Sequence, residues 1–237
     1  MNTLHRTTYG AYHIGARKPL DPNQTDHLIT LFKAPTSPTG SVLGGRTSIV
    51  TDVIEGIGPV VIKHYRRGGL ISRFIKKTYL GLGKPRCQSE FEMLSHVRSI
   101  GVSAPQPVAF GHRGGLFYQC WLATLEIRSH QTLAQLSRVD LERSLEMIDS
   151  VAEHIERLIQ AGIRHVDLHP GNVLVDPDDH IFLIDFDRAG PSRLDQRSLR
   201  SRYLERWKRA VTKHRLEPAL WQNLEAALGK SRRSQSA

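Results

Sequence analysis

Apolar positions change their spacing several times along the chain. Residues 41–65 alternate short runs rich in valine and isoleucine with glycines, as in "SVLGGRTSIV" and "GPVVIKHY", which predicts a small antiparallel sheet with tight turns. Residues 84–100 repeat apolar side chains every three positions from Phe91 to Val97, the spacing of one helical face. Gly101 follows as a stop signal. We therefore expect a helix packed on a sheet in this half of the chain.

The rest of the chain returns to strand spacing and then becomes mostly helical. "PQPVAF" and "LFYQCWLATLEI" have the composition of strands. Residues 131–161 repeat apolar side chains at three and four positions, which predicts one long helix, and residues 193–228 predict helix again. The first 38 residues have weak periodicity and end in "APTSPTG", so they predict an irregular lead-in with one short element at "HLITLFK".

Composition and charge narrow the class of protein. The 237 residues carry 33 Lys and Arg against 23 Asp and Glu, a net charge of +10 that favours an anionic partner such as nucleic acid, an acidic membrane surface or a phosphorylated substrate. No apolar run approaches the roughly 18 residues that cross a bilayer, and the first residues lack a secretory pattern, so a cytoplasmic location is expected. Cys87 and Cys120 lack metal-site spacing and predict buried free thiols.

Acidic residues interrupt the apolar runs of "HVDLHPGNVLVDPDDHIFLIDFD", residues 165–187. Asp167 and Asn172 lie five apart with a Pro-Gly loop between them, and Asp185 follows an apolar strand immediately. Oxygen ligands from such positions suit Mg²⁺, which is usually held by one or two carboxylates together with substrate phosphates. A nucleotide is therefore implied, whereas "DPDD" between two strands predicts only a hairpin turn.

These two motifs resemble the catalytic loop (HxDxxxxN) and the metal loop (DFG) of the protein-kinase-like fold. The resemblance implies that Asp167 orients the attacking hydroxyl and accepts its proton, and that Asn172 and Asp185 hold the metal ions on the nucleotide phosphates. The alternative is that these side chains only cap turns in a buried loop.

The same resemblance requires a lysine on a small-lobe strand, a glutamate on the next helix and a glycine loop that binds phosphate. Lys63 in "VVIKHY" and Glu90 in the following helix fill the first two places, with Glu92 as the alternative glutamate. Gly44 and Gly45 fill the third, because missing side chains let backbone N–H groups approach phosphate. A strand-end lysine with its head in water and a plain hairpin turn are the structural alternatives.

Departures from protein kinases point to a different acceptor. Val166 stands where regulated protein kinases have an arginine, Asp187 replaces the glycine of DFG, and no APE-like segment follows. A small-molecule or glycan hydroxyl is therefore expected rather than a peptide. His169 in "DLHPGN" resembles the antibiotic and choline kinases, and lies either near the transferred phosphoryl group or in a loop-stabilising position.

The stretch "VVIKHYRRGGLISRFIKKTYL", with "GGR" before it and "LIDFDRA" after it, resembles the lipopolysaccharide core kinases over residues 41–190. Closest in pattern are those that act on 3-deoxy-D-manno-octulosonic acid (Kdo). This implies phosphorylation of a Kdo hydroxyl in Kdo-lipid A, using ATP and Mg²⁺, by a peripheral protein at the cytoplasmic face of a Gram-negative inner membrane.

The implied fold is α+β and bilobal, with a small antiparallel-sheet N-lobe that carries one main helix and a mostly helical C-lobe. The predicted boundaries are an irregular lead-in at 1–38, an N-lobe at 39–121, a hinge that binds adenine at 122–126, a C-lobe at 127–228 and a disordered basic tail at 229–237.

Two basic segments are candidates for contact with a membrane. In residues 66–77, apolar residues share one helical face and five Lys or Arg supply the charge, so the segment could meet an anionic glycolipid surface or simply pack on the core. In "RSLRSRYLERWKRAV" apolar residues recur every four positions, and a core helix with a basic exterior is favoured over a membrane helix. Arg46 and Arg188 either stabilise the transferred group or form salt bridges.

Other functions stay open at this point. They are a heptose, aminoglycoside or choline-type kinase, an atypical RIO-like protein kinase, and a pseudokinase. The +10 charge disfavours cationic acceptors, and the presence of Lys63 with Asp167, Asn172 and Asp185 argues against a pseudokinase. No nucleic-acid partner is expected, although salt-dependent RNA binding would support the RIO-like alternative.

Overall fold

A computed structural model describes the chain in two compact units. Unit 1 comprises residues 1–95 and 106–126, and unit 2 comprises residues 96–105 and 127–237. The described residues are 4–35, 37–40, 46–65, 79–80, 83–115 and 117–234.

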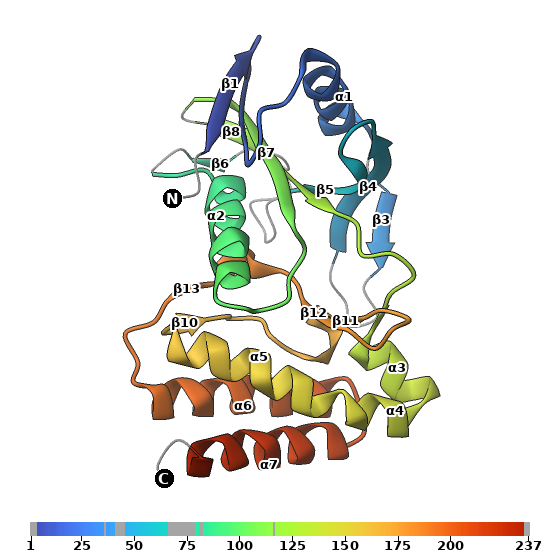
Figure 1. The fold of residues 1–237 in the computed structure, drawn as a ribbon, viewed down its shortest axis with the longest axis vertical. Helices are drawn as coiled ribbons and strands as arrows, with labels where there is room; N and C mark the ends of the chain where they lie inside the picture. The colour runs from blue at the N-terminus through green and yellow to red at the C-terminus, as the bar shows by residue number, and fades with distance from the viewer. Residues whose placement is uncertain are drawn as a thin grey trace. The chain divides into compact units, whose positions relative to one another are not determined.

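Unit 1 is built on an antiparallel sheet. Its described strands pair in the order β1-β2-β7-β8-β5-β4-β3, with β6 paired to β8 as well (Figure 1). The elements are β1 (His5–Tyr9), β2 (Tyr12–Ala16), α1 (Pro22–Lys33), β3 (Ser37–Gly40), β4 (Arg46–Ile54), β5 (Gly58–His64), β6 (Tyr79–Leu80), α2 (Arg86–Ser99), β7 (Pro107–Gly114) and β8 (Phe117–Leu125).

The β4–β5 hairpin has the tight glycine turn that its sequence predicts. Gly56 has a φ of +73°, a left-handed conformation that costs glycine little, and the strands pair from Ile54 with Gly58 to Ser48 with His64. Helix α2 also forms where expected, with Phe91 and Val97 buried and Gly101 at a φ of +84° after its end. The sheet and the helix predicted for this half are therefore confirmed.

The prediction of an irregular lead-in at 1–38 is wrong. Strands β1 and β2 form a hairpin that extends the sheet at β7, and α1 packs on β4 and β5. Helix α1 starts five residues before "HLITLFK", because the Asp21 carboxylate accepts from the Gln24 backbone N–H while the Gln24 side chain accepts from the Asp21 N–H. This capping box and Pro22 at the first helical position were the signals in the sequence.

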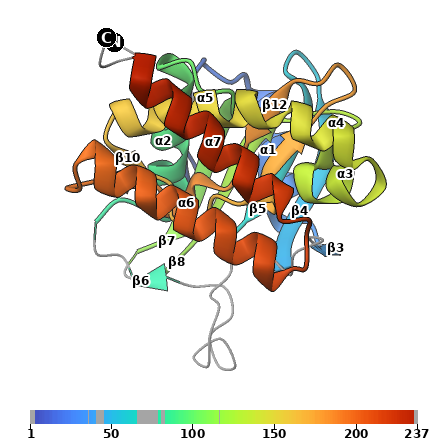
Figure 2. The ribbon, with the colours of Figure 1, turned by 90° about the horizontal axis from the view of Figure 1, so that it is seen from below.

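Unit 2 is mostly helical. It contains α3 (Leu133–Val139), α4 (Leu141–Glu146), α5 (Ile148–Gln160), α6 (Gln196–Lys213) and α7 (Ala219–Ser234), and α5, α6 and α7 pack on one another (Figure 2). The shorter elements are β9 (Gln131–Thr132), β10 (Ile163–Arg164), the 3₁₀ turn η2 (Pro170–Asn172), β11 (Val173–Val175), β12 (Ile181–Leu183), the 3₁₀ turn η3 (Phe186–Arg188) and β13 (Gly190–Pro191).

Residues 131–161 form β9 and three helices, not the one long helix predicted. Thr132 caps the start of α3 through the Gln135 N–H, and Asp140 accepts from the Arg143 N–H to start α4. Asp140 has a non-helical backbone, with φ −149° and ψ 90°, which explains the break. Most apolar side chains of α3 and all those of α5 are buried, whereas the two leucines of α4 are only partly buried.

Residues 193–228 also divide, at Arg215 with a φ of +52° and the following Pro218, into α6 and α7. The apolar series of α6 is buried, with Leu199, Tyr203 and Trp207 each at most 3% exposed. The prediction that this segment is a helix packed in the core is therefore confirmed. The predicted disordered tail is wrong for residues 229–234, which continue α7. In the described part of the chain no helix has the length and apolar content to span a membrane.

The α+β prediction, with an antiparallel sheet followed by a mostly helical region, is confirmed. Residues 122–125 of the predicted hinge are the end of β8, and the hinge itself stays a prediction.

Candidate active site

In unit 1, Lys63 and Glu90 form an ion pair. Strand β5 carries Lys63 and α2 carries Glu90, and the lysine Nζ lies 3.0 Å and 2.9 Å from the two carboxylate oxygens. The lysine side chain is 20% exposed and the glutamate side chain 3%. The Tyr65 hydroxyl donates to the same carboxylate, and the lysine Nζ lies 5.2 Å from the centre of the Tyr65 ring. A buried acid therefore fixes a lysine whose side chain is still partly exposed.

The geometry also separates the two candidate glutamates of α2. Glu92 is a surface residue whose carboxylate accepts from Lys84 at 2.8 Å and from the Gln88 amide at 2.9 Å. Glu92 therefore has partners on α2 and just before it, whereas Glu90 is the one that meets Lys63. The nucleotide-binding role of the pair stays a prediction. Gly44 and Gly45, and the basic segment at 66–77, lie outside the described residues.

In unit 2, the loop that carries Asp167 is fixed to α6 and to the strand before Asp185. The Tyr203 hydroxyl of α6 accepts from the His165 backbone N–H at 2.9 Å and donates to the Ile163 carbonyl at 2.8 Å. Burial raises the pKa of Tyr203, so this hydroxyl keeps its proton. The His165 ring contacts the Ile184 carbonyl at 3.0 Å and packs edge-on against Phe186.

Asn172 is held through its side-chain nitrogen, and no described residue donates a hydrogen bond to its amide oxygen. Its side-chain nitrogen donates to the Asp167 backbone carbonyl at 2.9 Å, and its backbone N–H donates to the His169 carbonyl at 2.8 Å. The Asn172 carbonyl accepts from the Ile184 N–H at 3.0 Å, which brings Asp185 beside it. An amide oxygen and a carboxylate fit the oxygen donors that Mg²⁺ prefers.

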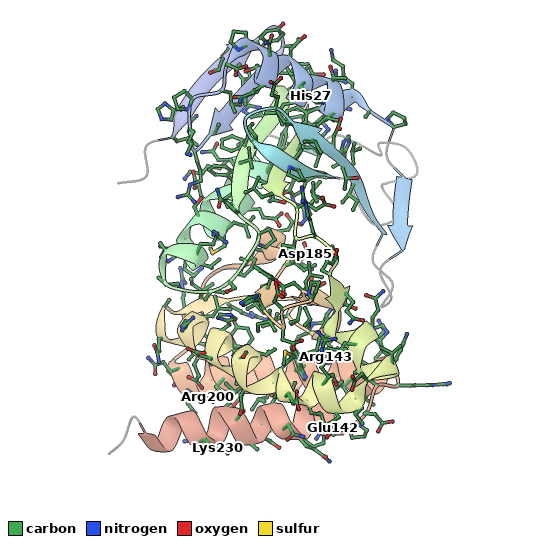
Figure 3. All side chains as sticks on the ribbon, turned by 45° about the vertical axis from the view of Figure 1, so that its right-hand side comes forward. His27, Glu142, Arg143, Asp185, Arg200 and Lys230 are labelled. Carbon is green, nitrogen blue, oxygen red and sulfur yellow. The ribbon has the colours of Figure 1, made fainter. Side chains whose placement is uncertain are left out.

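Asp185, which is labelled in Figure 3, is an exposed residue. Its backbone is left-handed, with φ 65° and ψ 58°. This conformation is uncommon for a residue with a Cβ, although aspartate tolerates it better than most. The turn η3 follows at once, and the Ala189 N–H closes it on the Phe186 carbonyl. Strained backbone of this kind collects at functional sites, which agrees with a metal-binding role for Asp185.

His169 has a loop-stabilising position. Its Nδ1 accepts from the Gly171 N–H at 3.1 Å and so caps η2. Burial, helped by the positive charge of Arg206, lowers the pKa of His169 to about 4. The side chain is therefore neutral at physiological pH and supplies no positive charge for a phosphoryl group, which favours the second of the two predicted roles.

Two arginines meet the Asp167 carboxylate. Arg206 of α6 lies 3.2 Å from Oδ1, and Arg188 of η3 lies 3.9 Å from Oδ2. The Arg188 side chain is 68% exposed, whereas Arg206 is 29% exposed. The sequence predicts Arg188 near this site, either stabilising the transferred group or forming a salt bridge, and the structure shows its contact with Asp167. The contributions of Arg206, Tyr203 and His165 were missed, although Arg206 and Tyr203 stand three apart in a helix whose apolar pattern was recognised.

Two further predictions are confirmed away from this loop. The "DPDD" stretch is a turn between β11 and β12 in which the Asp176 carboxylate accepts from the Asp178 and His180 N–H groups. Both cysteines are buried free thiols.

An antiparallel sheet with a fixed lysine, followed by a helical unit with the Asp167 loop, defines a phosphotransferase of the protein-kinase-like fold. The chain belongs to the Lipopolysaccharide kinase (Kdo/WaaP) family, whose model matches residues 42–227.

Curated relatives carry a more specific name. The chain is 32% identical over 162 residues to a 3-deoxy-D-manno-octulosonic acid kinase of Vibrio vulnificus (strain CMCP6), covering 67% of each protein. It is 29% identical over 216 residues to a protein of the same name from Vibrio parahaemolyticus, covering 88% of this chain and 87% of that one. A third, from Stenotrophomonas maltophilia (strain K279a), is 34% identical over 163 residues, 68% of this chain and 64% of its own length.

Proposed function

We propose that the protein transfers the γ-phosphoryl group of ATP to a hydroxyl of Kdo in Kdo-lipid A, during assembly of the lipopolysaccharide core. The observation that carries this proposal is the family match over residues 42–227, together with relatives named as kinases of this sugar acid. Membership of a kinase family implies the use of ATP.

Asp167 is the residue that would orient the acceptor. Its carboxylate is 36% exposed, on a loop that Tyr203 and His165 fix at both ends. A hydroxyl that donates to this carboxylate is held for attack and can pass its proton to it as the bond to phosphorus forms. Arg206 and Arg188 would hold the carboxylate in place by charge, since each approaches a different oxygen.

Lys63, Glu90, Gly44 and Gly45 would bind the nucleotide. The lysine head carries a positive charge for the phosphates, and the buried Glu90 keeps that head in one position. The backbone N–H groups of the two glycines would complete the phosphate site. Catalysis would then consist mainly of positioning and charge neutralisation.

Asn172 and Asp185 would hold Mg²⁺ through their side-chain oxygens, in agreement with the donor set that the loop provides. When bound, the ion neutralises charge on the phosphates. The acceptor is a membrane glycolipid, so we also propose peripheral contact with the cytoplasmic face of the inner membrane. The basic stretch at 66–77 and the +10 net charge support such contact with an anionic surface.

Transfer from labelled ATP with Mg²⁺ tests the proposal. The acceptors are Kdo-lipid A, heptosylated core, an aminoglycoside, choline and a protein. Label in Kdo-lipid A alone is the expected result. Selective label in another acceptor would keep the kinase and refute the substrate, and ATP binding without transfer to any acceptor would refute the enzyme.

A further inference from the structure

A pocket of about 340 Å³ opens in unit 2 directly beside Asp167. It is lined by residues of three segments, namely β10, the Asp167 loop and α6. Its charged residues are Asp167, Glu205 and the four arginines Arg164, Arg202, Arg206 and Arg209. The volume lies in the range of pockets that take one small ligand, and the four arginines favour an anion.

The arginines of α6 reach the pocket because of their spacing. Arg202, Arg206 and Arg209 stand at positions i, i+4 and i+7, which lie on one face of a helix. The neighbouring face is buried in the unit and includes Tyr203, which fixes the start of the Asp167 loop. The same helix therefore positions the loop and presents a stripe of positive charge next to it.

The four arginines differ in whether a carboxylate of the protein lies close to them. Arg206 is engaged with Asp167, and Arg202 lies 3.4 Å from Glu205 on the exposed surface of the helix. Arg164 and Arg209 are exposed, and within the described part of the chain neither lies within 4.0 Å of a carboxylate.

Arg200 shows the contrast within the same helix. Arg200, which is labelled in Figure 3, forms a two-point ion pair with Glu156 of α5, at 2.9 Å and 2.7 Å. Both side chains are largely buried. The charge of Arg200 is therefore paired with an acid inside the protein. Arg164 and Arg209 have no such partner among the described residues, although they share the pocket with the residue that would receive the acceptor.

We propose that Arg164 and Arg209 bind the carboxylate of the acceptor sugar while Asp167 receives its hydroxyl. This inference rests on the proposed function, because the acceptor there is a sugar acid. A guanidinium matches a carboxylate by two parallel hydrogen bonds, which gives orientation as well as charge. The lining of one pocket with the volume of a small-ligand site includes both arginines and Asp167. The pair thus makes the enzyme specific for an acidic sugar.

The phosphate groups of the lipid are the other possible source of an anion for this pocket. The test therefore compares three acceptors: a Kdo glycoside without lipid, its methyl ester, and Kdo-lipid A. The glycoside keeps the carboxylate and lacks phosphate, and the ester lacks both charges. For the wild type we expect kcat/KM for the glycoside to exceed that for the ester by about tenfold or more.

Variants then locate the effect. Arg164→Gln and Arg209→Gln should each raise KM for the glycoside about fivefold to tenfold, leave kcat within about twofold and leave the ester unchanged. Arg209→Lys should recover part of the loss, because lysine keeps the charge without the two-point geometry. Arg197→Gln is the matched control, since Arg197 is an exposed arginine of α6 outside the pocket lining. Thermal unfolding of each variant verifies folding.

The outcomes separate the inference from the function. Equal use of glycoside and ester by the wild type, or equal losses on both in the variants, would refute the carboxylate site and leave the kinase intact. Losses confined to Kdo-lipid A would assign the arginines to lipid phosphate and refute the inference as stated. Absence of transfer to every Kdo acceptor by the wild type would refute both the proposed function and this site.

Discussion

The ion pairs of the two units are arranged in opposite ways. In unit 1 the acid is buried, with Glu90 at 3% exposure, and the lysine is the member that reaches solvent. In unit 2 the acid Asp167 is 36% exposed, and it is held at its two oxygens by arginines at 3.2 Å and 3.9 Å. In each unit, the side chain that a ligand would contact is held by oppositely charged neighbours and stays partly exposed: Lys63 in unit 1 and Asp167 in unit 2.

The difference matches the chemistry expected of each side chain. A group that binds phosphate needs a fixed positive charge, and a buried carboxylate fixes it most firmly because the acid cannot exchange its partner for water. A group that receives a hydroxyl proton needs an accessible carboxylate, and loosely attached arginines leave it accessible. The following predictions test this contrast, from the largest expected effect to the smallest.

Asp167→Asn should have the largest effect. The amide keeps the shape of the side chain but cannot accept the proton of the hydroxyl, so we expect kcat to fall roughly 10²- to 10⁴-fold. Transfer from labelled ATP to Kdo-lipid A measures the loss, and thermal unfolding verifies the fold. Asp178→Asn, in the exposed turn after β11, is the matched control and should keep full activity. Activity above a tenth of the wild type would remove Asp167 from its proposed role.

The Lys63–Glu90 pair should respond asymmetrically to substitution. Lys63→Met leaves a carboxylate that is 3% exposed without its cation, at a cost of about 3 kcal/mol in the free energy of unfolding. Glu90→Gln leaves a lysine that can still reach water, so the cost should be smaller, about 1 to 2 kcal/mol. Urea unfolding of both variants measures the difference.

The control for this pair is Lys84→Met, which breaks the exposed pair with Glu92 and should cost less than about 1 kcal/mol. A larger loss for Glu90→Gln than for Lys63→Met would contradict the view that the buried acid is the critical partner.

The two arginines at Asp167 should differ in importance. Arg206 is the nearer and more buried, so Arg206→Gln should lower kcat about tenfold with KM for ATP unchanged, because the carboxylate loses a positioning contact. Arg206→Lys should restore most of that loss. Arg188→Gln should change kcat by no more than about twofold, since this side chain is largely exposed. Equal effects of the two Gln variants would argue against a positioning role for Arg206.

The smallest expected effect is on the pH dependence of stability, and it comes from the buried His154 of α5. Burial, with the charge of Arg157, holds the pKa of His154 below the ordinary 6.5. The unfolded chain therefore takes up a proton as pH falls below 6.5 while the folded protein resists it, so stability decreases toward acid.

One proton changes the free energy of unfolding by at most about 1.4 kcal/mol per pH unit. Urea unfolding from pH 7.5 to 5.5 should show a shallower acid loss for His154→Leu than for the wild type. The same substitution at the exposed His96 is the control and should leave the slope unchanged. An unchanged slope for His154→Leu would exclude this histidine as a source of acid sensitivity.

Most of the elements could be predicted from local pattern, and the errors have local physical causes. The strands of the β4–β5 hairpin and helix α2 were predicted because glycine turns and apolar spacing act over a few residues. The break at Asp140 was missed because apolar spacing continues across it, while the cap that divides the helix is a single side chain. The N-terminal hairpin was missed because its first strand is exposed throughout and has little apolar signal.

The sequence by itself determined the chemistry: a carboxylate, an amide and a second carboxylate at the spacing of two loops, a lysine at a strand end, and membership of a kinase family. Only the tertiary structure decided which partners those groups have. It selected Glu90 over Glu92 for Lys63, and it brought Arg206 to Asp167 across 39 residues. The physical reason is that spacing fixes neighbours within a few residues, whereas a partner on another element depends on how the apolar faces pack.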